Sequence, residues 1–171
     1  MLSEAKILEQ IQTLDRSLDK KIIFNLSKYG YELISPKEIM QQKKISIEEL
    51  IALILAKIPV PRFIEAIPVL LLKNKIDKFK IVEMSCKYDI NNQLGYLIEI
   101  TMLIAKKLNL KTDYNDLWSY FKIKKIKSLC EEKDKDYQEF LMKSSPKRIK
   151  KWNLLGRFFD EDFIKSAKMY L

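Results

Sequence analysis

The chain has 171 residues, a net charge of +9 at pH 7 and a hydrophobic fraction of 47%. Such a chain is too apolar to be intrinsically disordered and long enough to form one globular core. Its three glycines, two cysteines and complete lack of histidine exclude glycine-rich phosphate loops, cysteine–histidine zinc sites and catalysis by a histidine base.

The chain also lacks the sequence features of secreted and membrane proteins. Its N-terminus has neither the charged nor the apolar region of a signal peptide. Its most apolar stretch is interrupted by charged residues and prolines, so it cannot form a spanning helix. We therefore expect a cytoplasmic protein with no membrane partner.

Helical periodicity begins at the N-terminus. Apolar residues at helical spacing predict one helix over residues 4–18 and a second over 19–29, which Gly30 ends in the left-handed conformation. Two capping boxes then mark helix starts at Ser35 and Ser46, each with a glutamate three residues further on. These are the most specific boundary signals in the chain.

The most apolar segment covers residues 47–72. Pro59 and Pro61 divide it into two helices, and Pro68 kinks or restarts the second because proline has no amide hydrogen. The first of these helices has apolar side chains on nearly every face. We therefore expect its neighbours to enclose it.

The first of these helices also ends a segment, residues 21–58, with the rhythm of a helix-turn-helix. It would be the recognition helix of such a motif. Its side chains are two glutamates and otherwise aliphatic groups, whereas base recognition uses Arg, Asn, Gln or Ser. A core role is the better interpretation.

The second half of the chain is predicted to be helical as well. Asp77 is the expected N-cap of a helix that ends at Tyr88, and residues 92–108 form a clear amphipathic helix that contains Gly95. We interpret this glycine as a point where another helix comes close. Further helices are expected over residues 113–121, 136–142 and 151–171.

The predicted fold class is therefore all-α, a compact bundle of short helices with a helix-turn-helix-like N-terminal part. We expect residues 1–110 to form a helical core domain and residues 111–171 to form a basic helical extension packed on it, as one domain overall. The paired carboxylates fall at helix caps or in charged runs. We expect no enzyme, no metal and no cofactor.

Positive charge is concentrated between Lys106 and Lys151, which include 14 basic and 7 acidic residues. Basic side chains near an aromatic ring can follow a phosphate backbone and stack on bases, whereas a lysine-rich surface can also be merely solvated. The candidate contacts to nucleic acid or to an acidic partner are Lys122, Lys124, Lys125, Lys127, Lys147, Arg148, Lys150, Lys151 and Trp152.

Two pairs of polar residues interrupt apolar helices. Arg62 and Glu65 are three residues apart, as are Tyr96 and Glu99, so the members of each pair share a helix face. One interpretation is an internal ion pair between Arg62 and either Glu65 or Glu99. The other is a polar hot spot in an apolar partner-binding face.

Three segments, EELIALILAK, PRFIEAIPVLLLKN and KYDINNQLGYLIEI, lie between residues 47 and 108. They resemble helical segments of the AbiEi-like antitoxins of nucleotidyltransferase toxin–antitoxin pairs, and NQLGYLIE at residues 92–99 is close to an RLGYLLE signature of that group. The resemblance implies a protein that counters a nucleotidyltransferase-like toxin encoded beside it. Many such antitoxins also repress their operon through an N-terminal winged helix, but this chain lacks a basic recognition helix.

The sequence therefore predicts a non-catalytic, antitoxin-like or regulatory protein that acts through protein–protein contacts. Two alternatives stay open. One is a basic helical protein that binds nucleic acid through the Lys122–Trp152 region, and the other is a structural or assembly subunit.

Overall fold

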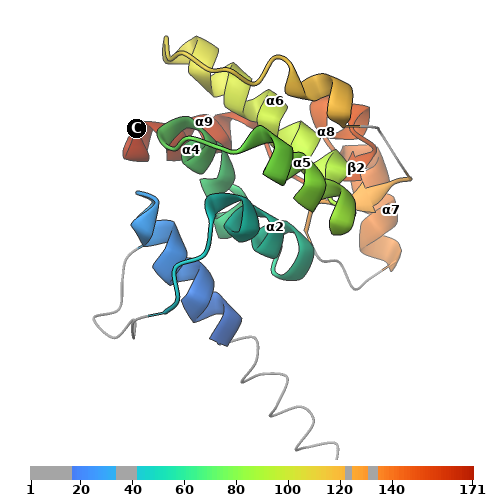
Figure 1. The fold of residues 1–171 in the computed structure, drawn as a ribbon. Helices are drawn as coiled ribbons and strands as arrows, with labels where there is room; N and C mark the ends of the chain where they lie inside the picture. The colour runs from blue at the N-terminus through green and yellow to red at the C-terminus, as the bar shows by residue number, and fades with distance from the viewer. Residues whose placement is uncertain (1–16, 34–41, 122–124, 131–134) are drawn as a thin grey trace, which may run out of the picture.

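The computed structural model describes residues 17–33, 42–121, 125–130 and 135–171 (Figure 1). Residues 17–28 are helical. The first half continues with α2 (Ile47–Lys57), α3 (Pro61–Ile64), α4 (Ala66–Lys73), α5 (Lys78–Lys87) and α6 (Asn91–Lys107). The second half contains a short 3₁₀ helix η1 (Leu117–Tyr120), β1 (Lys127–Ser128), α7 (Lys135–Ser144), α8 (Lys147–Lys151), β2 (Leu154–Leu155) and α9 (Asp160–Tyr170). The predicted all-α fold class is confirmed.

The helix over residues 17–28 ends as the sequence predicts. Gly30 has a φ of +84°, its amide donates to the Ser27 carbonyl, and the Tyr31 amide donates to the Leu26 carbonyl. This is the hydrogen-bond pattern of a left-handed C-terminal cap. The predicted helix over 4–18 falls almost wholly, and the capping box at Ser35 entirely, outside the described residues.

Two N-terminal caps are confirmed. The Ser46 hydroxyl accepts from the Glu49 amide at 3.3 Å, and the Glu49 carboxylate accepts from the Ser46 amide at 3.1 Å. Asp77 likewise accepts from the Phe79 and Lys80 amides at the start of α5. The capped helix α2 is enclosed as expected, with Leu50 among its fully buried side chains.

The break in the second apolar helix lies at Glu65, between α3 and α4. Pro68 is in the first turn of α4, where its missing amide costs nothing because those amides have no partner within the helix. A continuous helix would place the Pro68 ring against the carbonyl of Ile64. The predicted restart is therefore confirmed, three residues before the proline.

The core brings the two halves of the chain together. Helices α4, α6 and α9 contact one another, while α2 packs on α5. Helix α6 also contacts α5, and Figure 1 shows α6 along the upper side of the molecule. Phe163 of α9 shares one hydrophobic cluster with Leu70 of α4 and Leu97 of α6. The domain boundary at residue 110 stays a prediction. None of the described helices has the length and apolarity to cross a membrane.

A two-residue parallel strand pair joins the segment before α7 to the segment after α8. Lys127 pairs with Leu154 and Ser128 with Leu155. The Lys127 amide donates to the Asn153 carbonyl and the Leu129 amide to the Leu155 carbonyl, both at 2.9 Å. The sequence predicted no strand firmly, although the KIKKIK run that leads into β1 could pass for a short one, because so short a pairing leaves no periodic pattern.

Candidate functional site

Trp152 is packed directly against the backbone of α6. The residue follows α8 as its C-terminal cap, and only 2% of it is exposed. A Cβ atom on Gly95 would lie under 3.0 Å from three atoms of the indole ring. The glycine in α6 therefore makes room for this ring. A close approach was expected at Gly95, but it comes from a tryptophan side chain after α8 and not from the backbone of another helix.

Glu99 lies one helical turn after Gly95 and receives three donors from the α8 region. The Trp152 indole Nε1 donates to its Oε2 at 2.6 Å, and Arg148 Nη1 and Lys151 Nζ donate to its Oε1 at 2.6 and 3.2 Å. The Glu99 side chain is 13% exposed. Charge-assisted hydrogen bonds of this kind compensate a carboxylate for the loss of water.

Arg148 extends this cluster to the last helix. Its Nε donates to both carboxylate oxygens of Asp160, in the first turn of α9, at 3.2 and 3.3 Å. One guanidinium therefore joins α6, α8 and α9. We call the six residues of this cluster the Trp152 dock: Gly95, Glu99, Arg148, Lys151, Trp152 and Asp160.

The Trp152 dock corrects several sequence predictions. A buried indole cannot stack on bases, so the predicted nucleic-acid contact at Trp152 is wrong. Arg148 and Lys151 are instead paired with Glu99. The same contacts hold Glu99 inside the protein and make it an internal anchor rather than part of a partner-binding face.

The predicted role of Tyr96 is wrong for a similar reason. Its side chain is fully buried, and its ring meets Phe163 of α9 edge-on, with the ring centroids 6.1 Å apart. Burial raises the pKa of the Tyr96 hydroxyl above its usual value, and this hydroxyl has no hydrogen-bond partner among the described residues. Tyr96 is a core residue because α4, α5 and α9 all contact α6.

The remaining predicted basic contacts differ in their environments. Lys127 pairs with Asp89, and Lys150 Nζ donates to the Lys143 carbonyl at 3.0 Å. Lys125 and Lys147 are exposed. Lys122 and Lys124 lie outside the described residues.

The ion pairs predicted for Arg62 are also wrong. Arg62 pairs with Asp19, on the helix over residues 17–28, at 3.5 Å, and its guanidinium lies 4.7 Å from the centre of the Phe63 ring. Glu65 is half-buried, and no described residue forms an ion pair with it. Burial, with a smaller contribution from the charge of Asp162, raises the pKa of the Glu65 carboxyl.

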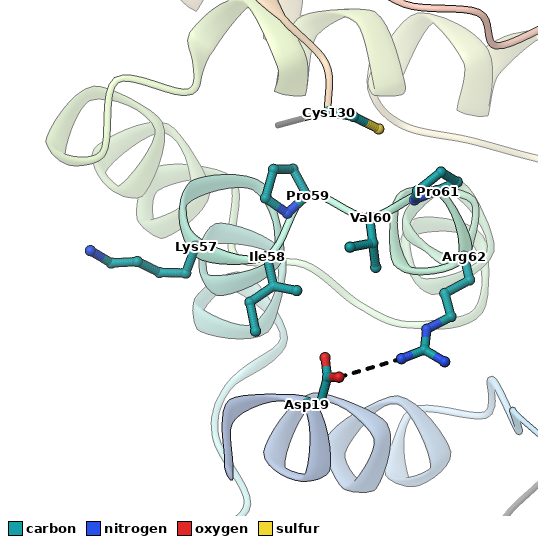
Figure 2. A pocket seen from close by; sticks show the side chains of 8 residues that line it. All are labelled: Asp19, Lys57, Ile58, Pro59, Val60, Pro61, Arg62 and Cys130. Atoms are coloured by element: carbon teal, nitrogen blue, oxygen red, sulfur yellow. Dashed lines mark ion pairs between the residues drawn. The ribbon is translucent and has the colours of Figure 1, made fainter. Parts of the chain in front are cut away.

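Arg62 lines a cavity of about 610 Å³ whose wall is formed by residues 57–62, Asp19 and Cys130. Figure 2 shows the Arg62–Asp19 pair on one side of the Pro59–Val60–Pro61 segment and Cys130 on the other. The apolar side chains of this segment therefore lie between the Arg62–Asp19 ion pair and Cys130.

Glu65 lines a second cavity, of about 370 Å³, which shares Pro61 and Cys130 with the first. Its other walls come from α7, α9 and the segment between β2 and α9, and include Tyr137, Arg157 and Asp162. We call the two adjoining cavities the α3 groove. The sequence singled out Arg62 and Glu65 but missed the distant residues, since no local pattern links them to α3.

The α3 groove has the chemistry of a binding surface. It combines apolar lining residues with two arginines and a tyrosine, and arginine and aromatic residues are enriched at protein–protein interfaces. No group of three potential metal ligands occurs among the described residues.

No family model, curated protein or solved structure matches the chain. The resemblance to AbiEi-like antitoxins therefore stays a prediction. Within the segment that carries it, Gly95 and Glu99 hold Trp152 in place. In this protein, Gly95 and Glu99 therefore connect α6 to the α8 region.

Proposed function

We propose that this protein is a non-catalytic regulatory protein of the antitoxin type, which binds a partner protein along the α3 groove. The observation that carries the proposal is the groove itself. Two cavities of about 610 and 370 Å³ adjoin at Pro61 and Cys130, and Glu65 at its wall has no ion-pair partner among the described residues. A binding partner would supply an ion-pair partner for Glu65.

The floor of the α3 groove suits a partner surface that docks without rearrangement. Pro59 and Pro61 have fixed φ angles and no amide hydrogen, and Val60 between them is extended, with φ −89° and ψ 149°. The Val60 amide donates to the Ile58 carbonyl at 2.8 Å. A segment held in this way loses little conformational entropy on binding.

The nucleic-acid alternative has less support. Binding of this kind needs exposed cations and an accessible aromatic ring. Trp152 is buried and Arg148 is held by Glu99 and Asp160. Lys151, with 54% of its side chain exposed, pairs with Glu99, and Lys127 is paired with Asp89. The exposed cations that remain are those of an ordinary lysine-rich surface.

The antitoxin type rests on the resemblance of residues 47–108, and it names the partner class: a nucleotidyltransferase-like toxin. The role of Gly95 and Glu99 in the Trp152 dock supports this assignment in one respect. Residues that fix the packing of α6 and α8 would keep the fold the same among related antitoxins, even where the residues that bind the toxin differ.

The proposal predicts that a nucleotidyltransferase-like protein is encoded beside this gene, and the test is co-expression of the two. We expect that protein to arrest growth and this chain to restore it. The variant Arg62→Glu, in the α3 groove, should restore growth less well, while Lys107→Glu should match the wild type because Lys107 is exposed and lines neither cavity. The absence of such a toxic neighbour, or the absence of rescue, contradicts the proposal.

A further inference from the structure

We propose that the α3 groove accepts a partner segment that presents a lysine or arginine side chain, whose cation binds between the carboxylates of Glu65 and Asp162. This inference rests on the proposed function, because it names the chemistry of the partner at the same groove. It commits to a basic segment of a protein, not to a nucleic acid or an acidic peptide.

The first argument is that the two carboxylates line one cavity and have no ion-pair partner among the described residues. Glu65 and Asp162 both line the cavity of about 370 Å³, and neither forms an ion pair with a described residue. The Asp162 carboxylate accepts a hydrogen bond from the Phe159 amide at 3.2 Å. Their mutual repulsion and the half-burial of Glu65 leave this wall with negative charge that a bound cation would offset.

The second argument is that the three arginines of the described residues have other partners. Arg157 lines the same cavity, but its guanidinium lies over the Phe140 ring, 5.6 Å from the ring centre. Arg62 is paired with Asp19 and Arg148 with Glu99 and Asp160. Glu65 and Asp162 therefore line this cavity together with Arg157, but none of the described arginines pairs with either carboxylate.

The third argument is that the cavity can also hold the stem of a basic side chain. Lysine and arginine bury their methylene groups on apolar surface while the charged end reaches a polar site. Pro61, Leu141 and Phe158 provide apolar surface here. Tyr137 lines the same cavity and stacks on Phe140, with the ring centroids 5.9 Å apart. An aromatic ring beside a cation adds attraction.

The test is selection of peptides from a random phage-displayed library on the full-length protein. We expect the selected peptides to share one position that is enriched about tenfold or more in lysine or arginine. A synthetic peptide of the best sequence should bind about tenfold more weakly when that residue is replaced by norleucine. This change in Kd corresponds to a loss of about 1.4 kcal/mol of binding free energy.

Three variants test whether the selection depends on the carboxylates of Glu65 and Asp162. The double variant Glu65→Gln with Asp162→Asn should lose the enrichment, and Glu65→Lys with Asp162→Lys should select aspartate or glutamate instead. Glu83→Gln removes an exposed carboxylate that lines neither cavity of the α3 groove and should leave the enrichment unchanged. Circular dichroism and urea unfolding show that each variant is folded before selection.

The outcomes separate this inference from the proposed function. Enrichment that survives in the Gln/Asn double variant overturns the inference, as do peptides without a shared cation or a selection that yields no binding peptide. Growth rescue without cation preference would leave the proposed function standing and refute only the basic partner segment. Cation-dependent peptide binding without growth rescue would support the segment and refute the antitoxin assignment.

Discussion

Glu65 and Glu99 occur in similar sequence contexts but in opposite environments. Each interrupts an apolar helix, and each follows another polar residue by three positions. Glu99 accepts three hydrogen bonds from Trp152, Arg148 and Lys151, whereas Glu65 has no ion-pair partner among the described residues. The difference depends on which distant segment packs on each helix. We therefore expect Glu99 to contribute to stability and Glu65 to contribute to binding.

The energetic consequence follows from burial. A carboxylate removed from water is stabilising only when donors replace the lost hydration. The Trp152 dock satisfies this condition and ties α6, α8 and α9 together. The α3 groove does not satisfy it, so the same residue type there raises the free energy of the unbound protein and favours a partner that brings a cation.

The largest expected effect is that of Trp152→Ala. Removing the buried indole leaves a cavity between α6 and α8, so we expect the free energy of unfolding to fall by about 3–5 kcal/mol. Urea denaturation measures it. Trp152→Phe keeps a ring on Gly95 but loses the Nε1 donor, and it should cost about 1–3 kcal/mol. An alanine variant as stable as the wild type would mean that the Trp152 dock contributes nothing to stability.

Arg148→Met should have the next largest effect. It removes the bridge from Glu99 to Asp160 and leaves a half-buried carboxylate with fewer donors, which we expect to cost about 2 kcal/mol. Lys147→Met is the matched control, because Lys147 is the exposed neighbour of Arg148 in α8, and its loss should change stability by no more than about 0.5 kcal/mol. Equal effects of the two substitutions would contradict the account of the Trp152 dock.

Gly95→Ala should destabilise the protein although alanine favours a helix. The gain in helix propensity is about 1 kcal/mol, but the new methyl group meets the rigid Trp152 ring under 3.0 Å away. Overpacking of this kind costs about 1–3 kcal/mol, so the net change should be a loss of about 1 kcal/mol. In the control Gly156→Ala the nearest atoms lie at 3.4 Å, an ordinary contact. A more stable Gly95→Ala variant would contradict the close packing of the indole.

The smallest expected effect concerns the pH dependence at Glu65. The folded protein raises the pKa of this carboxyl above its ordinary value of 4.5, so the folded state binds the proton more tightly than the unfolded state. The stability that this proton contributes is present below pH 4.5 and is lost as the pH rises through the folded pKa. Urea titrations of the wild type and Glu65→Gln should therefore diverge above pH 4.5, with the variant the more stable at pH 7. Parallel curves would mean that Glu65 is not desolvated.

Local signals in the sequence predicted the local structure of this protein. The Ser46 and Asp77 caps and the restart before Pro68 depend on residues within a few positions of one another, and the structure has all three. Gly95 was expected to mark a close approach, but its partner was not predictable. Trp152 is far along the chain, and its packing depends on how α8 is placed against α6.

The candidate site was predicted less well for the same reason. Four polar residues in apolar helices were treated as one candidate surface, yet Tyr96 is in the core and Glu99 is in the Trp152 dock. Arg62 and Glu65 do line one groove. The residues that complete this groove come from α7, α9 and the segment before α9, and no spacing rule connects them to α3.

The most direct test of this account compares Glu99→Gln with Glu65→Gln by urea denaturation at pH 7. Both substitutions remove one negative charge and keep the shape of the side chain. The account predicts opposite signs: Glu99→Gln should lower the free energy of unfolding by about 2 kcal/mol, because three donors lose a charged acceptor, and Glu65→Gln should raise it. Destabilisation by both variants, or by neither, would contradict the division of the molecule into an internal dock and a binding groove.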